Sequence, residues 1–311
     1  MNSLKNQSNI LVTRHDKIGD FITILPLCKV LKQNGYNVTV LVSKINVDLA
    51  KRLDFIDNVL EYSDDEITLI KRLAPYKFKA SISGYIEFRL GLCLFLLKIP
   101  IRIAPATKIA QIFFNKKLKQ RRSEVKKTEW EYNLDLAKKL DENINLDFQT
   151  PLLKLENKKE DFIIFHVGFG GSSDGNLSLD EYLSLAKSAL KHTKVVFSFG
   201  PDDDLSKEYI QTQITNNKLP FTIRDDFKSI WDFTLFIASS KLFVSTSTGP
   251  MHLAGLTNTP TLSFFGDSLF ASSKRWATIS DKVFQNNFEI PLENRDKIYK
   301  KIEHKLLEII K

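Results

Sequence analysis

Residues 242–267, LFVSTSTGPMHLAGLTNTPTLSFFGD, decide the fold class of this chain. They predict an apolar strand, a turn of hydroxyl residues, a short helix, a turn marked by proline and a second apolar strand. Gly249 lets a backbone approach a ligand closely, and Pro250 suits the first helical position because its missing N–H would be unpaired there anyway. Such a helix directs unpaired amides and a positive dipole end beyond the strand. The stretch therefore predicts either an ordinary strand–helix turn or a phosphate site.

A second strand–turn–helix opens the chain. Residues 9–14, NILVTR, predict a buried strand, and the segment after them has the apolar spacing of a helix that packs on a sheet. Asp20 falls in the first turn of that helix, where a carboxylate is favoured with or without a role in chemistry. Residues 36–42 predict the next strand. Repeated apolar strands with intervening helices indicate an α/β fold with a parallel sheet covered on both faces.

The length and a change in composition predict two domains. A chain of 311 residues can form two domains of about 150 residues each. The polar segment 141–159, which contains Pro151, is the expected linker, so the predicted domains are 1–150 and 151–311. In the second domain we predict strands at 162–165, 195–199 and 221–224 and helices at 178–191 and 230–239. A last helix at 293–311 is a candidate for packing back on the first domain.

Two motifs far apart in the chain resemble one known family. RHDKIGD at 14–20 and STGPMHLAG at 247–255 are similar to motifs of the heptosyltransferases, the bacterial glycosyltransferases of family 9 that add heptose to the lipopolysaccharide inner core. Residues 76–84, 131–136 and 165–168 also fall where that family has counterparts. The resemblance implies the GT-B architecture, with two Rossmann-like domains facing each other across a cleft. The first domain would bind the acceptor and the second the nucleotide sugar.

The same resemblance implies roles for individual residues. Asp20 matches the general base, and direct displacement at the anomeric carbon by the hydroxyl it deprotonates would invert the configuration. Arg14 and Lys17 flank Asp20 and are expected acceptor-binding residues, although on a loop they could equally be solvated. The expected donor-binding residues are Gly19, Gly170, Gly171, Ser172, Ser173, Asp203, Ser247, Thr248, Gly249 and His252. For His252, a structural role as a buried imidazole is an equal alternative.

Phosphate binding is expected without a metal. Residues 168–173, which we call the glycine loop, contain three glycines and two serines. This composition favours an anion-binding concavity over a plain flexible loop. Asp202, Asp203 and Asp204 form the one acidic cluster beside a predicted strand end, but the flanking Gly200-Pro201 and a following helix indicate a helix N-terminus with one carboxylate on a ribose hydroxyl. We therefore predict no metal and no cofactor beyond a nucleotide-sugar co-substrate. Amides and the hydroxyl at Thr248 would stabilise the departing phosphates.

Two departures from the family concern the donor. Many members have a lysine before a Trp-Pro pair after the glycine loop, whereas residues 174–178 here are DGNLS. Many also have Asp directly before Thr-Gly-Pro, where this chain has Ser247. Loss of both members of an ion pair avoids leaving one uncompensated charge. The departures suggest that the sugar, or even the nucleotide, differs from that of ADP-heptose, so the expected donor is ADP-heptose or another nucleotide diphosphate sugar.

Charge is concentrated in the first half of the chain. Residues 1–155 hold 26 Lys and Arg against 17 Asp and Glu, and residues 98–127 alone hold ten basic residues and one acidic residue, Glu124. A charge run of this kind is commonly a solvated face. Its mixture with Ile112, Phe113 and Phe114 also suits an anionic lipid-linked glycan or the surface of the inner membrane. No nucleic-acid-binding motif accompanies the run, so we expect no nucleic-acid partner.

The remaining composition favours a cytoplasmic enzyme that associates peripherally with the inner face of the membrane. Cys28 and Cys93 lie in apolar contexts and are expected to be reduced core residues. The N-terminal residues lack the apolar region of a secretory signal. The longest apolar run, residues 90–97, is far shorter than a membrane span.

Three functional hypotheses follow. The first is an inverting, metal-independent glycosyltransferase acting on a lipid-linked glycan of the lipopolysaccharide core type. The second is a catalytically inactive protein that binds a nucleotide sugar on the same fold. The third is a nicotinamide-dependent oxidoreductase, which ranks last because HDKIGD contains one glycine and not the GxGxxG fingerprint.

Overall fold

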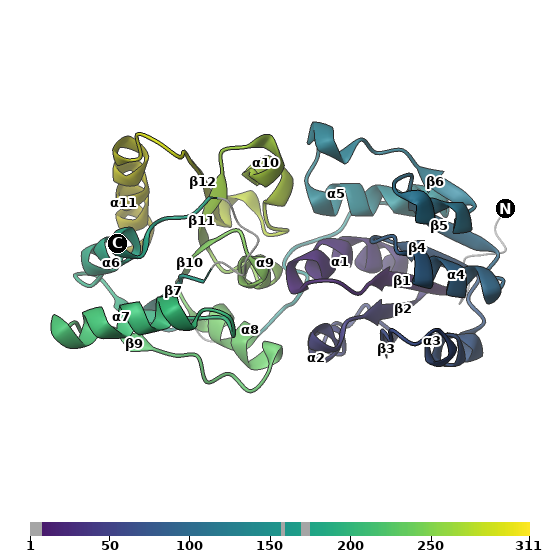
Figure 1. Ribbon diagram of the computed structural model, residues 1–311, viewed down its shortest axis with the longest axis horizontal. Helices are drawn as coiled ribbons and strands as arrows, with labels where there is room; N and C mark the ends of the chain where they lie inside the picture. Colours follow the sequence, from purple (N-terminus) through teal and green to yellow (C-terminus); the bar gives the residue numbers. More distant parts are fainter. Residues whose placement is uncertain (1–7, 157–158, 169–174) are drawn as a thin grey trace. The chain divides into compact units, whose positions relative to one another are not determined.

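The computed structural model describes residues 8–156, 159–168 and 175–311. The chain divides into two compact units, Met1–Leu152 and Leu153–Lys311. Each unit is built on its own six-stranded parallel sheet with helices on both faces (Figure 1). The predicted α/β fold class is therefore confirmed. None of the helices in the described part of the chain combines the length and the hydropathy that a membrane span requires.

The first unit has the strand order β3-β2-β1-β4-β5-β6. Its strands are rich in Val, Ile and Leu because both faces of a parallel sheet are buried. They are β1 (Asn9–Arg14), β2 (Asn37–Val42), β3 (Asn58–Glu61), β4 (Ala80–Ser83), β5 (Ile101–Pro105) and β6 (Lys116–Leu118). The predicted strands at 9–14 and 36–42 are thus neighbours inside this sheet, and the first of them is one of its two central strands.

Two groups of helices cover the faces of the first sheet. The helices are α1 (Ile18–Gln33), α2 (Val47–Ala50), α3 (Glu66–Leu73), α4 (Phe88–Leu96) and α5 (Glu129–Leu134), and the 3-10 turn η3 spans Ile109–Phe113. Helices α3 and α4 pack with η3 over Leu11, Leu41 and Leu60. Helix α5 packs on α1. Cys28 and Cys93 are buried and free, as predicted.

The second unit repeats the topology with the order β12-β11-β10-β7-β8-β9. Its strands are β7 (Phe162–His166), β8 (Lys194–Ser198), β9 (Thr222–Ile223), β10 (Leu242–Thr246), β11 (Thr261–Gly266) and β12 (Gln285–Ile290). Its helices are α6 (Leu179–Ala189), α7 (Asp204–Asn216), α8 (Ile230–Ser239), α9 (Gly249–Leu256), α10 (Ser273–Trp276) and α11 (Asp296–Ile310). The predicted helix at 230–239 has the observed bounds of α8, and α9 begins one residue before the predicted Pro250.

Alternation along the strands separates two layers in the second unit. Phe165, Val244 and Phe264 point to one face, where they pack with residues of α6, α7 and α11. The opposite face carries Phe243 and His166 and meets α8, whose Phe233 lies 5.7 Å from the His166 ring. Ile302, Leu306 and Ile310 of α11 are part of the core of this unit. Packing of α11 on the first unit stays a prediction.

Both sheets reverse their strand order once. The reversal lies between β1 and β4 in the first unit and between β7 and β10 in the second. In open α/β sheets, ligands bind outside the carboxyl ends of the strands at such a switch point, because the connections leave it in opposite directions. The segments after β1, β4, β7 and β10 are therefore where each unit is expected to bind its ligand.

Candidate active site

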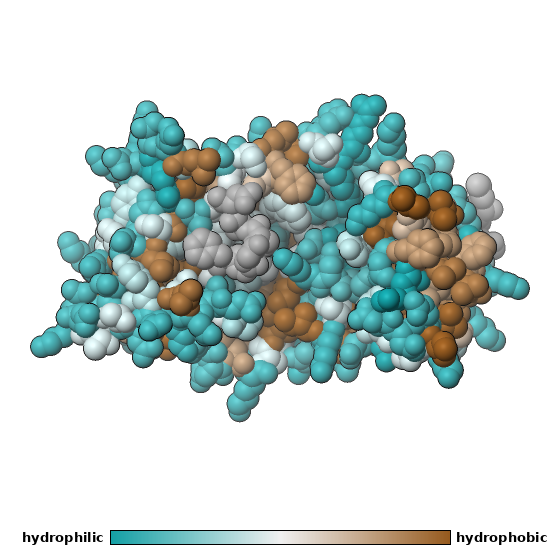
Figure 2. Space-filling view, in the orientation of Figure 1, coloured by the Kyte–Doolittle hydropathy of each residue, from teal (hydrophilic) through white to brown (hydrophobic). Residues whose placement is uncertain are grey.

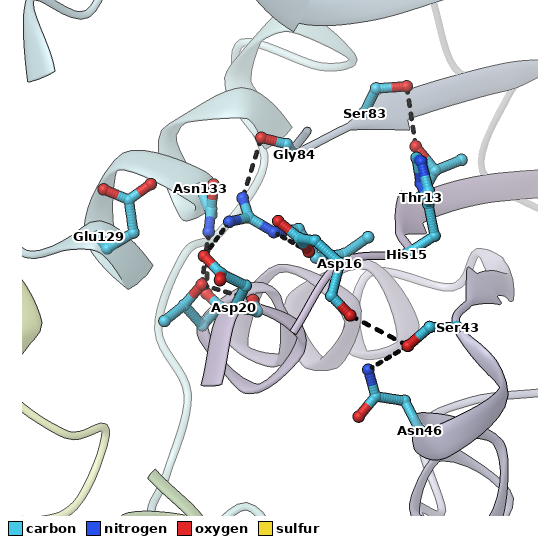
Figure 3. A network of polar contacts seen from close by, with 12 residues as sticks. Thr13, His15, Asp16, Asp20, Ser43, Asn46, Ser83, Gly84, Glu129 and Asn133 are labelled. Carbon is cyan, nitrogen blue, oxygen red and sulfur yellow. Dashed lines mark hydrogen bonds and ion pairs between the residues drawn. The ribbon is translucent and has the colours of Figure 1, made fainter. Parts of the chain in front are cut away.

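Arg14, the last residue of β1, organises the switch point of the first unit. Its Nε donates to Asp16 Oδ1 at 2.9 Å, its Nη1 donates to the carbonyl of Gly84 at 3.0 Å, and its Nη2 donates to Asp20 Oδ1 (Figure 3). A Cβ on Gly84 would lie 2.6 Å from Ile24 Cδ1 and 3.3 Å from Arg14 Cδ, so a larger residue there would force the Ile24 side chain, and to a lesser extent Arg14, to shift. We call Arg14, Asp16 and Asp20 the Arg14 cluster.

The electrostatics of the Arg14 cluster depend on its burial. The Arg14 side chain is 6% exposed, whereas those of Asp16 and Asp20 are each 21% exposed. Burial raises the pKa of Asp16 to about 6; the positive charge of Arg14 opposes this rise, and the negative charge of Asp20 adds to it. Burial alone would lower the pKa of Arg14, but Asp16 and Asp20 raise it above its ordinary value. The cluster therefore holds a fixed cation between two carboxylates that still reach solvent.

Helix α5 supports the turn that carries Asp20. The Asn133 side chain donates to Thr23 Oγ1 at 2.9 Å, and Thr23 Oγ1 donates to the carbonyl of Asp20 at 2.7 Å. Asn133 is fully buried, and Glu129 of the same helix is 4% exposed. On the other side, Ser43 Oγ donates to the carbonyl of Asp16 at 3.0 Å (Figure 3). Both acidic residues are thus held by their backbone as well as by Arg14.

A second polar group lies beside the Arg14 cluster. His15 Nε2 lies 2.9 Å from Glu87 Oε2, which also accepts from the Tyr62 hydroxyl at 2.8 Å. The His15 ring stacks on Tyr62 with centroids 4.0 Å apart. Burial lowers the pKa of His15, although Glu87 opposes the shift. This neutral imidazole connects the ends of β1, β3 and β4.

The switch point of the second unit contains the start of α9. Thr248 is the N-cap residue of this helix, and its side chain makes no capping hydrogen bond. Its hydroxyl instead has a long contact of 3.4 Å to the carbonyl of Thr246. Ser247, Thr248 and Gly249 are each partly exposed. The amides of the first turn of α9 therefore have no side-chain cap. A helix N-terminus that binds an anion needs such amides, because they donate to the anion.

Both described ends of the glycine loop are tightly packed. A Cβ on Gly168 would lie 1.7 Å from Asp203 Oδ2, and the same oxygen accepts from the Gly200 amide at 2.7 Å. A Cβ on Gly175 would lie 2.1 Å from the backbone nitrogen of Gly266. Thr246 Oγ1 donates to the Gly175 carbonyl at 2.6 Å. The chain thus leaves β7 against Asp203 and returns against β11.

A row of polar side chains crosses the second sheet at the same edge. Ser263, Ser245, His166 and Ser198 occupy matching register positions on β11, β10, β7 and β8. His166 Nδ1 lies 3.1 Å from Ser198 Oγ, and burial lowers the pKa of His166 to about 4. Among the residues that the structure describes, the buried hydroxyls of Ser245 and Ser263 have no hydrogen-bond partner.

Comparison with known proteins identifies the class of enzyme. No family model matches the chain. A curated protein of Haemophilus influenzae, named "Putative glycosyltransferase", is 34% identical over 303 residues, which cover 88% of this chain and 86% of that protein. The chain belongs to the glycosyltransferases.

Solved structures place this glycosyltransferase in the GT-B fold class. Escherichia coli ADP-heptose lipopolysaccharide heptosyltransferase II has a TM-score of 0.80 and 17% identity, covering 97% of this chain and 98% of that one. The E. coli heptosyltransferase WaaC, solved with ADP, has a TM-score of 0.74 and 14% identity, covering 97% and 99%. The predicted GT-B fold is confirmed, and the chain shares it with these heptosyltransferases.

The predicted site residues of the glycosyltransferase fall at both switch points. Arg14 and Asp20 lie in the Arg14 cluster, Lys17 is exposed, and Gly19 is buried in the first turn of α1. In the second unit, Ser247, Thr248 and Gly249 lie at the start of α9, and His252 is buried within this helix. Asp203 is 9% exposed and holds the Gly200 turn. Gly170, Gly171, Ser172 and Ser173 lie outside the described residues.

Several residues of the candidate site were not identified from the sequence. Asp16 lies inside the RHDKIGD motif, and its position just after a buried strand was an available signal. Glu87 and Tyr62 had no local signal, since they meet His15 from 72 and 47 positions away. In residues 8–156, 159–168 and 175–311, no group of three or more His, Cys, Asp or Glu side chains is placed to hold a metal ion.

Proposed function

We propose that this glycosyltransferase moves heptose or a related sugar from a nucleotide diphosphate donor to a lipid-linked glycan, with inversion and without a metal. The observation that carries the proposal is the Arg14 cluster. It holds two solvent-accessible carboxylates on one buried cation at the switch point of the first unit. A carboxylate fixed in this way can take a proton from an acceptor hydroxyl.

The donor is proposed to bind at the start of α9. The uncapped first-turn amides and the Thr248 hydroxyl are suited to the diphosphate, because fixed dipoles stabilise the charge that develops on a leaving phosphate. The presence of ADP in the WaaC structure supports a donor of this chemical class. Asp203, tied to Gly200, is proposed to fix the turn beside the ribose, and Ser247 and His252 are proposed to line the same site.

Asp20 is proposed as the general base. The acceptor oxygen attacks the anomeric carbon, the bond to the nucleotide diphosphate breaks, and the hydroxyl proton passes to Asp20. Attack opposite the leaving group inverts the anomeric carbon. Arg14 is proposed to hold Asp20 for this step, because each of its three nitrogens already donates to a group of its own unit. Lys17, which is exposed one turn away, is then the proposed contact with an anionic acceptor.

The acceptor is proposed to be an anionic glycan linked to lipid, at the cytoplasmic face of the inner membrane. The excess of basic residues in the first half of the chain supports an anionic partner. Peripheral contact with the membrane surface would bring the enzyme to such an acceptor.

An inactive protein that binds nucleotide sugars is the second candidate. It is favoured by Ser247 and by residues 174–178, which lack the acidic and basic residues that many family members have there. Binding of a donor without turnover across a panel of acceptors would favour this candidate.

Thermal-shift measurements against ADP-, GDP- and UDP-sugars, followed by transfer assays, test the proposal. A donor at a hundredfold excess over its Kd should stabilise the protein by about 2.7 kcal/mol. Transfer of the sugar from that donor, with an inverted product, is the expected result. A protein that is stabilised by none of these sugars, or that transfers none, would contradict it.

A further inference from the structure

Helix α4 and the turn η3 expose a group of large apolar side chains in the first unit. Phe88, Phe95 and Leu96 of α4 and Ile109 and Ile112 of η3 are each more than half exposed, and Ile109 reaches 80%. Figure 2 shows hydrophobic residues gathered over the region of α4. We call these five residues the α4–η3 surface. Exposed apolar groups of this extent mark interaction sites.

The α4–η3 surface is one structure and not a set of scattered side chains. Phe113 of η3 lies with its ring centroid 4.9 Å from that of Phe88 and 6.1 Å from that of Phe95. A Cβ on Gly91 would lie 2.9 Å from the Phe113 ring, so this glycine permits the close approach of η3 to α4. The fold therefore holds both apolar segments together.

Helix α4 is apolar on its outer face as well as its inner face. Its sequence FRLGLCLFL contains one charged residue, and Leu90, Cys93 and Leu94 already supply the buried face. A helix that is hydrophobic all round is normally buried on all sides. The outer face of α4 thus has the composition of a surface that is covered in the working protein.

Basic residues lie beside this apolar surface. A hollow of about 300 Å³ is lined by Phe95, Leu96, Lys98, Ile99, Pro100 and Arg102. The exposed side chains of Lys98, Lys117 and Lys119 have no carboxylate partner in the part of the chain that the structure describes. The one acidic residue of the segment, Glu124, is already paired with Arg121 and Lys126. Apolar groups next to unpaired cations complement the interface of an anionic bilayer.

The α4–η3 surface is also connected to the candidate base. Glu87, which binds His15, is the N-cap residue of α4 and directly precedes Phe88. Lys108, which directly precedes Ile109, lies over the Tyr85 ring at 4.5 Å, and Tyr85 meets the His15 ring edge-on at 5.5 Å. His15 in turn follows Arg14. A contact made by α4 and η3 therefore lies a few side chains from the Arg14 cluster.

We propose that the α4–η3 surface inserts into the headgroup region of an anionic bilayer and positions the first unit beside a membrane-embedded acceptor. The position beside an acceptor rests on the proposed function, whereas insertion itself does not. The apolar side chains enter the boundary between headgroups and acyl chains, and Lys98, Lys117 and Lys119 contact lipid phosphates.

Vesicle flotation of the full chain tests insertion. The vesicles contain phosphatidylethanolamine with anionic phosphatidylglycerol, or phosphatidylcholine alone. The wild type should bind the anionic vesicles, and both F95S/I109S and I109S/I112S should weaken this binding about tenfold or more. L205S/V283S is the matched control, since it removes two apolar residues of the second unit that are at least as exposed on average and should bind like the wild type. K117E/K119E should weaken binding to anionic vesicles only.

Two outcomes would overturn the proposal. One is equal vesicle binding by the wild type and both apolar double variants. The other is that the wild type binds no vesicles and forms a dimer, which F95S/I109S converts to a monomer. The surface would then be a contact between two copies of this chain. In transfer assays, I109S/I112S should keep its rate on a detergent-free, lipid-truncated acceptor and lose it on the vesicle-embedded form. If the protein transfers sugar to neither form of the acceptor, the proposed function is wrong. The flotation result still decides whether the surface inserts into the bilayer.

Discussion

The guanidinium of Arg14 donates to the carboxylate of Asp20, which is six residues along the chain and in the first turn of α1. The strand end and the helix start are thereby joined by a charge pair, in addition to the short connection between them. Because Arg14 also donates to Asp16 and Gly84, its orientation is fixed from three directions. The position of Asp20 therefore depends on a residue that is itself nearly inaccessible to a substrate.

Replacing Arg14 with Met should destabilise the protein and impair turnover together. Two carboxylates would lose their buried cation, and removing one partner of a buried pair costs about 3 kcal/mol. The pKa of Asp16 should rise further above about 6, since the charge of Arg14 lowers it. Urea unfolding measures the change in stability, and pH–rate profiles measure the change in turnover and in the pKa.

R52M is the control for R14M. Arg52 pairs with Asp48 at an exposed site, with 3.8 Å between the charged atoms, and such a pair contributes less than about 1 kcal/mol to stability. Equal stability of R14M and R52M would contradict the prediction.

Replacing Asp20 with Asn should abolish transfer and leave donor binding intact. The amide keeps the shape of the side chain but cannot accept the hydroxyl proton, so kcat/KM should fall about a hundredfold or more. The nucleotide-sugar thermal shift should stay within error of the wild type. D16N is the matched control in the same cluster, and its loss should be less than about tenfold if Asp20 is the base. The opposite ranking would assign the base to Asp16.

The elements of the site were predictable where the signal is local. Residues 9–14 and 242–246 are short apolar runs that end in polar residues, and each forms a central strand. The hydroxyl turn with Gly249 and Pro250 correctly predicted the start of α9 to within one residue. In these segments, backbone preference and burial favour the same structure, so the sequence pattern was sufficient.

Contacts between distant segments were not predictable. Gly168 and Asp203 are 35 positions apart, and no spacing rule shows that one must be glycine to admit the carboxylate of the other. His15 meets Glu87 only because β1 and β4 are neighbours in the sheet. The exposure of the outer face of α4 was also not predicted. An apolar run of this length is typical of a buried segment, and the sequence alone does not show which of its residues are exposed.

Replacing Thr248 with Val should weaken donor binding without destabilising the fold. The Thr248 side chain makes no capping hydrogen bond, so its loss should change the free energy of unfolding by less than about 0.5 kcal/mol. A hydrogen bond to a charged phosphate contributes about 1.5–3 kcal/mol, so the donor Kd should rise about tenfold or more. S178A is the control: Ser178 forms a capping box on α6, and its loss should cost about 1 kcal/mol with no change in the donor Kd. An unchanged Kd in T248V would remove Thr248 from the donor site.

Replacing Gly168 with Ala should displace the carboxylate of Asp203. The new methyl group would lie 1.7 Å from Asp203 Oδ2, well inside van der Waals contact. The side chain must move away and release the Gly200 amide, with a loss of about 1–3 kcal/mol in stability. G168A/D203A relieves the clash and should be less destabilised than the sum of its single variants. Strict additivity in this double-mutant cycle would show that the two residues do not interact.

Acid should destabilise the second unit through His166. The pKa of His166 is lowered to about 4 by burial, whereas an unfolded histidine has its pKa near 6.5. Between these values the unfolded chain binds the proton and the folded chain does not, so stability present above pH 6.5 is lost as the pH falls toward 4. The loss should approach about 3 kcal/mol. Asp16 acts in the opposite direction, because its raised pKa favours the folded state as the pH falls from about 6.

The His166 contribution is therefore isolated by comparing the wild type with H166Q in urea at about pH 7.5 and pH 4.5. H192Q, which changes an exposed histidine, should retain the wild-type pH dependence. If H166Q shows the same loss on acidification as the wild type, His166 is not the buried group that opposes protonation.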